Sequence, residues 1–141
     1  MRKSILAAMF IYLFYSFSAN SMSVEDTQKY CKGYASQGFE MKNTGDLLCA
    51  NTIKTIMDMG YLNCGDLQKH IKKRGKEGAT VEELSGLYAI VSVYANDKIS
   101  IQDGVVSFLK WADKNPNLGK TNIVEHAYAY LSQPFPCKII D

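Results

Sequence analysis

The chain has few of the residues that perform catalysis or bind metals. It contains two histidines, His70 and His126, which lie 56 residues apart. No cysteine or histidine pair has the spacing of a zinc site, no glycine-rich loop could hold a phosphate, and no serine lies in a nucleophile elbow. We therefore expect no enzyme activity, no metal and no cofactor, and we expect both histidines to have plain surface or boundary roles.

The excess of positive charge is small and belongs to the first residues of the chain. The whole sequence has 16 Lys and Arg against 14 Asp and Glu. Without residues 1–21, which contain Arg2 and Lys3, the numbers are 14 and 14. A nucleic-acid-binding protein needs a basic surface to neutralise phosphates, so this balance argues against nucleic acid as a partner.

The N-terminus has the form of a secretory signal peptide. Arg2 and Lys3 precede an apolar run from Ile5 to Phe17. At about 13 residues the run is shorter than the roughly 20 needed to span a bilayer, and small residues follow it. We expect cleavage after residue 21 or 23, which leaves residues 22–141 as a single periplasmic domain. An uncleaved anchor is the alternative. No second apolar run follows, so we expect no membrane span after cleavage.

All four cysteines, Cys31, Cys49, Cys64 and Cys137, lie in the part of the chain that would be exported. An even number there indicates two structural disulfides, with a free or metal-bound pair as the alternative. The spacings of 18, 15 and 73 residues fit neither a zinc knuckle nor a CxxC redox motif. Four cysteines allow three pairings, and the sequence does not choose among them. Cys137 lies in a proline-rich tail that would fray unless a disulfide held it.

Apolar residues recur at helical spacing rather than in strict alternation. The spacing predicts a helix over 24–37, which begins after Ser23 and ends at Gly38, and a second over 46–59, which ends at Gly60. Residues 61–65 are then expected to form a turn. A shorter polar helix is expected after it, ending near residue 75.

Three further helix starts are marked by a capping residue three positions before an acid, at Thr80, Ser100 and Asn122. The helix after Thr80 has a wide apolar stripe and is expected to be central. The helix after Ser100 has a one-sided stripe and should end at Asn115, and the helix after Asn122 should end near Pro134. The sequence therefore predicts an all-α fold, a compact bundle of five to six short helices stapled by disulfides.

Two features are expected to contact a partner. Tyr61 lies off every predicted apolar stripe, and tyrosine is enriched in protein interfaces. A basic run contains Lys69, Lys72, Lys73 and Arg74. This run is typical either of the solvated end of a short helix, or of a contact patch for an acidic partner or an anionic lipid.

The last forty residues resemble a known family. The resemblance rests on the order and spacing of Ile99, Ser100, Ile101, Gln102, Asp103, Val105, Val106, Phe108, Leu109, Asn115, Pro116, Ala129, Tyr130, Leu131, Phe135, Pro136 and Cys137. In this order and spacing the segment resembles the Rap/Tai immunity proteins of type VI secretion. The segment from Cys31 to Tyr34 is similar to a further element of that family, whereas residues 39–98 show no match. The family usually has a cysteine and a proline just before the helix that begins at Ser100, where this chain has Asn96, Asp97 and Lys98.

The resemblance implies a function in binding. Rap/Tai proteins are small exported helical proteins that neutralise peptidoglycan amidase toxins in the periplasm, often as homodimers. The implied function is therefore that of a periplasmic immunity protein that binds and inhibits a cognate amidase effector, with a homodimer as the expected assembly. The alternative is a periplasmic stress or acid chaperone, also small, helical and disulfide-bonded.

Overall fold

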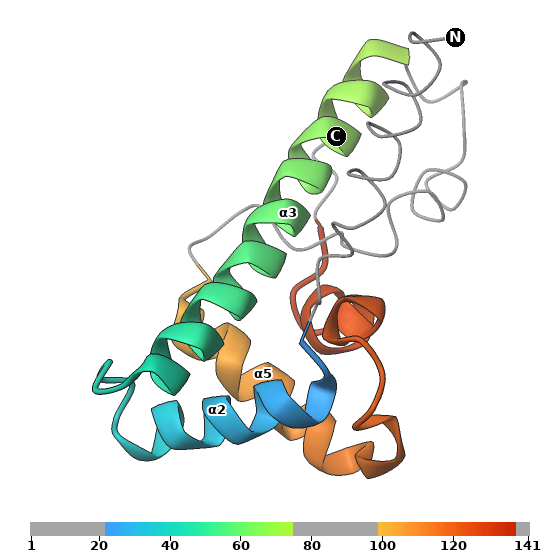
Figure 1. Ribbon diagram of the computed structural model, residues 1–141. Coiled ribbons are helices and arrows are strands. Elements are labelled where there is room, and N and C mark those ends of the chain that lie inside the picture. Colours follow the sequence, from blue (N-terminus) through green and yellow to red (C-terminus); the bar gives the residue numbers. More distant parts are fainter. Residues whose placement is uncertain (1–21, 75–98, 138–141) are drawn as a thin grey trace, which may run out of the picture.

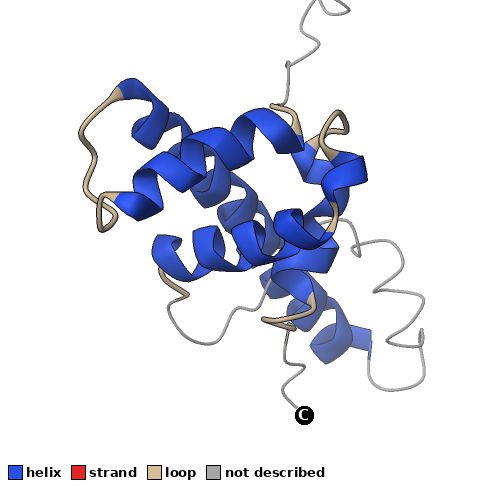
Figure 2. Ribbon diagram, turned by 90° about the horizontal axis from the view of Figure 1, so that it is seen from below, coloured by secondary structure: helices blue, strands red, loops and turns tan. Residues whose placement is uncertain are grey.

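The computed structural model describes residues 22–74 and 99–137 (Figure 1). The predicted signal peptide and the predicted helix after Thr80 lie outside these residues. The described part is helical and contains no strand, as Figure 2 shows. Its elements are α2 (Val24–Ser36), α3 (Thr44–Arg74), α5 (Ile101–Lys114), the 3-10 turns η1 (Pro116–Leu118) and η2 (Ile123–His126), and the π-helical turn η3 (Tyr128–Ser132). The prediction of an all-α, disulfide-linked fold is confirmed.

Helix α2 begins where the sequence predicts. The Ser23 hydroxyl accepts a hydrogen bond from the Asp26 backbone N–H at 3.1 Å and donates one to the Asp26 carboxylate at 2.7 Å. This cap satisfies a backbone donor that has no partner within the helix. After α2 the chain turns through Gly38 and Phe39, whose φ angles are 67° and 63°. A positive φ is strained for Phe39, because unlike glycine it has a Cβ atom. The Phe39 ring packs edge-on against Tyr34.

Helix α3 is continuous over 31 residues, so the turn predicted at 61–65 is wrong (Figure 1). A glycine inside a helix costs only about 1 kcal/mol relative to alanine. The buried positions Cys49, Ile53, Ile56, Gly60 and Cys64 continue at spacings of three and four residues into the predicted turn. The free energy gained by burying this stripe exceeds the cost of the glycines in the helix. The two predicted helices on either side of the predicted turn therefore form one helix.

Helix α5 confirms the helix predicted after Ser100. The Ser100 hydroxyl accepts a hydrogen bond from the Asp103 N–H at 3.1 Å, and the Asp103 carboxylate accepts one from the Ser100 N–H at 3.1 Å. These reciprocal bonds form a capping box. The buried side of α5 faces α2 and α3 and consists of Gly104, Val105, Phe108 and Ala112.

The segment after Asn122 is a 3-10 turn followed by a π-helical turn, rather than the predicted helix. Asn122 does cap it, because its side-chain oxygen accepts a hydrogen bond from the Val124 N–H at 2.8 Å. Tyr130, Leu131 and Ser132 are buried one after another. An α-helix with one apolar stripe would expose at least one of three consecutive side chains, whereas the wider π turn buries all three.

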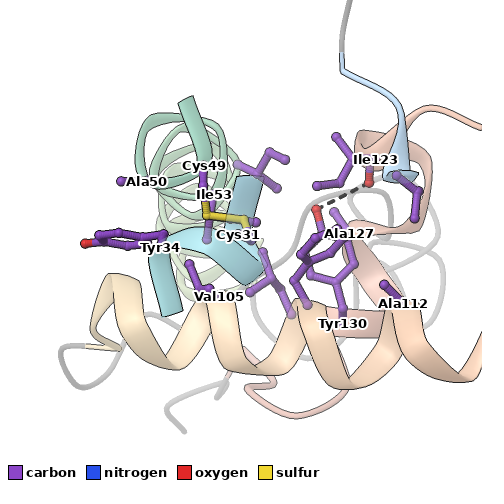
Figure 3. Close-up of a cluster of buried hydrophobic side chains, with 14 residues drawn as sticks. Cys31, Tyr34, Cys49, Ala50, Ile53, Val105, Ala112, Ile123, Ala127 and Tyr130 are labelled. Carbon is purple, nitrogen blue, oxygen red and sulfur yellow. Dashed lines mark hydrogen bonds between the residues drawn. A yellow bond between two sulfur atoms is a disulfide. The ribbon is translucent and has the colours of Figure 1, made fainter. Parts of the chain in front are cut away.

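The core lies where α2, α3, α5 and the C-terminal turns meet (Figure 3). The Cys31–Cys49 disulfide joins α2 to α3 inside it, with the two Cα atoms 5.1 Å apart. Tyr130 is fully buried, and its hydroxyl donates a hydrogen bond to the Ile123 carbonyl at 3.3 Å, the dashed line in Figure 3. The C-terminal turns are therefore part of the core.

All four cysteines are paired, which confirms the prediction of two disulfides. The second bridge joins Cys64 of α3 to Cys137, with the Cα atoms 5.7 Å apart. Cys137 thus ties the C-terminal tail down, as its proline-rich setting predicts.

Gly104 leaves no room for a side chain between α5 and α3. A Cβ atom placed there would lie 2.6 Å from Met57 Sδ and 2.9 Å from Ile53 Cγ2. We expect Gly104→Ala to lower the free energy of unfolding by about 1–3 kcal/mol, because overpacking outweighs the better helix propensity of alanine. Gly65→Ala is the matched control. No atom lies within 4 Å of its added Cβ, so it should raise the free energy by up to about 1 kcal/mol. Urea unfolding followed by circular dichroism measures both, and a stabilising Gly104→Ala would contradict the close contact.

The two disulfides differ in access to solvent, because Cys31, Cys49 and Cys64 are fully buried whereas Cys137 is half-exposed. A mild reductant should therefore open Cys64–Cys137 first, which differential alkylation and mass spectrometry would detect. Replacing both of its cysteines by alanine should lower the free energy of unfolding by about 4 kcal/mol, since the bridge closes a separation of 73 residues. Alkylated thiols in native, unreduced protein would contradict the pairing.

Candidate partner-binding surfaces

Helix α3 exposes several large apolar side chains on its outer side. Met59 and Leu62 are neighbours on the helix surface, and Tyr61 lies beside them. The exposed fractions of Tyr61 and Leu62 are 58% and 65%. Single exposed apolar residues need no explanation, but a group of them marks a candidate contact surface. The exposed large apolar residues of the described part are Met41, Leu47, Leu48, Met59, Tyr61, Leu62, Val106 and Tyr128.

The predicted contacts Tyr61, Lys69 and Lys72 lie on one side of α3. Tyr61 and Lys72 are 11 residues apart, which is about three helical turns, and Lys69 lies on the neighbouring row. Tyr61 is therefore part of a helix rather than of the predicted turn, and it is exposed as expected. Figure 1 shows this half of α3 extending past α2 and α5. We call Tyr61, Leu62, Lys69 and Lys72 the α3 face.

The charges of the α3 face remain open to a partner. Lys69 lies 3.5 Å from the Asp66 carboxylate, and both side chains are largely exposed. An ion pair this exposed contributes at most about 1 kcal/mol, so a partner's acid can replace Asp66. Lys72 is exposed and forms no ion pair with another described residue. Lys73 and Arg74 end the same helix, and their side chains, like that of His70, lie outside what the structure describes.

A second surface, which we call the α5 groove, lies between α5 and the C-terminal segment. It is an open hollow of about 750 Å³. Lys110 and Lys114, one helical turn apart on α5, line it together with apolar side chains. The apolar lining includes Phe39, Val106, Trp111, Tyr130 and Phe135.

Sequence reasoning missed the α5 groove. Phe39 comes from the turn after α2, Trp111 from α5 and Phe135 from the tail, so residues from three separate parts of the chain meet in it. The spacing of Lys110 and Lys114 is the one sign of the groove in the sequence, and two lysines at positions i and i+4 are common on any exposed helix face.

The side chain of His126 packs against α5 and forms a hydrogen bond with a residue close to it in the chain. The His126 ring lies against Trp111, with centroids 4.9 Å apart, and its Nε2 is 2.7 Å from the Thr121 hydroxyl. Burial raises the pKa of Tyr130, so its hydroxyl stays protonated and available to the Ile123 carbonyl. Within residues 22–74 and 99–137, no group of three or more His, Cys, Asp or Glu is placed to hold a metal ion.

The structure describes residues 99–137, the segment on which the predicted resemblance to the Rap/Tai proteins rests. This segment comprises α5, the three C-terminal turns and the tail that ends at Cys137. No helix among the described residues is long and apolar enough to cross a membrane. Comparisons of the chain with protein-family models, with curated proteins and with solved structures found no match, so the resemblance to the Rap/Tai proteins stays a prediction from the sequence.

Proposed function

We propose that the protein is a periplasmic immunity protein that binds and inhibits a peptidoglycan amidase delivered by type VI secretion. The observation behind this proposal is the order of residues from Ile99 to Cys137, which resembles the Rap/Tai family. In the structure this segment is not a loose tail. Ser107 donates a hydrogen bond to the Tyr130 carbonyl, and Cys137 is bonded to α3, so the segment is a fixed part of the fold.

The proposed location follows from the N-terminus and the cysteines. Residues 1–21 have the pattern of a signal peptide. Two disulfides are typical of chains that mature in an oxidising compartment, because cytosolic thiols are kept reduced. After export the protein would be in the periplasm, the compartment in which a peptidoglycan amidase toxin acts.

The α3 face supports inhibition by occlusion. A protruding element can block an enzyme cleft when a few of its side chains become buried there as anchors. Aromatic residues are frequent anchors of this kind. Tyr61 and Leu62 project from a helix that the Cys31–Cys49 and Cys64–Cys137 bridges fix at two points. A surface held rigid in this way loses little conformational entropy when it binds.

Protection should depend on export. Cells that receive the cognate amidase in the periplasm should survive when they express the full chain and lyse when they express it without residues 2–21. The reason is that the toxin and the inhibitor must share a compartment. Survival and cell lysis measure the effect, with immunoblots as the control for equal expression. Protection by the form without the signal sequence would contradict the proposal.

Tyr61→Ala should weaken binding to the amidase by about tenfold, as expected for an aromatic anchor worth more than 1 kcal/mol. Tyr128→Ala is the matched control, because Tyr128 is also exposed, at 47%, but belongs to η3 rather than to the α3 face. Isothermal titration calorimetry measures both affinities. If Tyr61→Ala binds the amidase no more weakly than Tyr128→Ala does, Tyr61 is not an anchor of the interface.

A chaperone is the second candidate, favoured by the exposed Leu47, Leu48, Met59 and Leu62 on α3. Such side chains could bind unfolded chains of many kinds. The two functions separate in one comparison. An immunity protein prefers one amidase, whereas a chaperone suppresses aggregation of unrelated proteins under acid stress. Broad anti-aggregation activity without amidase binding would favour the chaperone.

A further inference from the structure

We propose that the α5 groove binds an extended segment of a partner protein in which acidic and apolar side chains alternate. This site is separate from the α3 face, and the inference does not depend on the proposed function. It rests on the lining of the groove, on its net positive charge and on its length.

The floor of the groove is apolar and partly open to water. Val106 is 36% exposed, and Trp111 and Phe135 are half-buried around it. Covering apolar surface of this kind is favourable by about 25 cal/mol per Å². Gln102 and Gln133 also line the groove. A glutamine amide can donate a hydrogen bond to a peptide backbone and accept one from it.

The groove has a net positive charge because two lysines line it against one acidic residue. Lys110 and Lys114 are exposed, and neither forms an ion pair with another described residue. Asp103 is the acidic residue that lines the groove, and its carboxylate accepts hydrogen bonds from the backbone and hydroxyl of Ser100 at the start of α5. Two ammonium groups that no described acid pairs with, placed beside apolar side chains, complement carboxylates next to apolar residues.

The length of the groove sets the length of the segment. Gln102 and Lys114 are 12 residues apart on α5, a rise of about 18 Å. An extended chain advances about 3.3 Å per residue, so the groove accommodates about five to six residues.

A glycan fits the groove less well than a peptide. Sugars stack on a free aromatic face, but the Trp111 ring already packs against three other rings. Its centroid lies 6.4 Å from that of Phe108, 4.9 Å from that of His126 and 5.6 Å from that of Tyr130. The part of Trp111 that lines the groove therefore offers apolar contact rather than a stacking platform.

The test uses the oxidised mature protein and two end-blocked hexapeptides, one of alternating Glu and Leu and one of alternating Lys and Leu. Trp111 is the one tryptophan of the chain, so its fluorescence reports occupancy of the groove. We expect saturable binding of the Glu-Leu peptide, at least about tenfold tighter than that of the Lys-Leu peptide, and weaker at high salt.

Charge reversal then tests the assignment to the two lysines. Lys110→Glu and Lys114→Glu should each weaken binding of the Glu-Leu peptide by about fivefold or more. Lys29→Glu is the matched control, since Lys29 is exposed on α2, forms no ion pair with a described residue and does not line the groove. The proposal is overturned if the two peptides bind equally or not at all, or if all three variants behave alike. It is also overturned if an N-acetylglucosamine oligomer saturates the Trp111 signal and the Glu-Leu peptide does not.

Discussion

The contact between α3 and the two shorter helices α2 and α5 is the central packing contact of the described fold. The Cys31–Cys49 bridge fixes α2 to α3 within the core, and Gly104 lets α5 approach the same helix closely. The C-terminal turns then bury Tyr130 against Phe108 of α5, with the ring centroids 5.2 Å apart. The chain after α5 returns to α3 through the Cys64–Cys137 bridge, so α2, α5 and the C-terminal tail are all joined to α3.

The α5 groove is a consequence of this arrangement. The π turn buries Tyr130, Leu131 and Ser132 together, which leaves the next residues, Gln133 to Phe135, beside the outer side of α5. The buried side of α5 faces α2 and α3, so its outer side, with Lys110 and Lys114, remains available. The groove therefore exists because the tail is held near α5 without covering it.

Local signals in the sequence predicted the parts of the fold that local physics controls. Ser23 and Ser100 mark helix starts because a hydroxyl can satisfy an orphan N–H within three residues. The glycines at 60 and 65 were misleading, since a helix break is decided by the burial of Ile53, Ile56 and Cys64 along the whole stripe rather than by a single propensity. The π turn could not be predicted either, because its reason is the set of core positions that Tyr130, Leu131 and Ser132 fill.

The two candidate surfaces also differ in whether local sequence or the packing of distant residues determines them. The exposure of Tyr61 could be predicted, because Tyr61 lies off every apolar stripe, whereas the groove needed Phe39, Trp111 and Phe135 to be placed together. The two surfaces also differ in shape. The α3 face lies on the half of α3 that extends past α2 and α5, which suits insertion into a partner's cleft, while the α5 groove is a hollow that suits reception of a partner's chain. If the protein inhibits an amidase, a helix that enters the active cleft and a groove that holds a neighbouring segment would act on one partner at two points. Because both points belong to one disulfide-linked frame, the second contact would form at high effective concentration once the first is made.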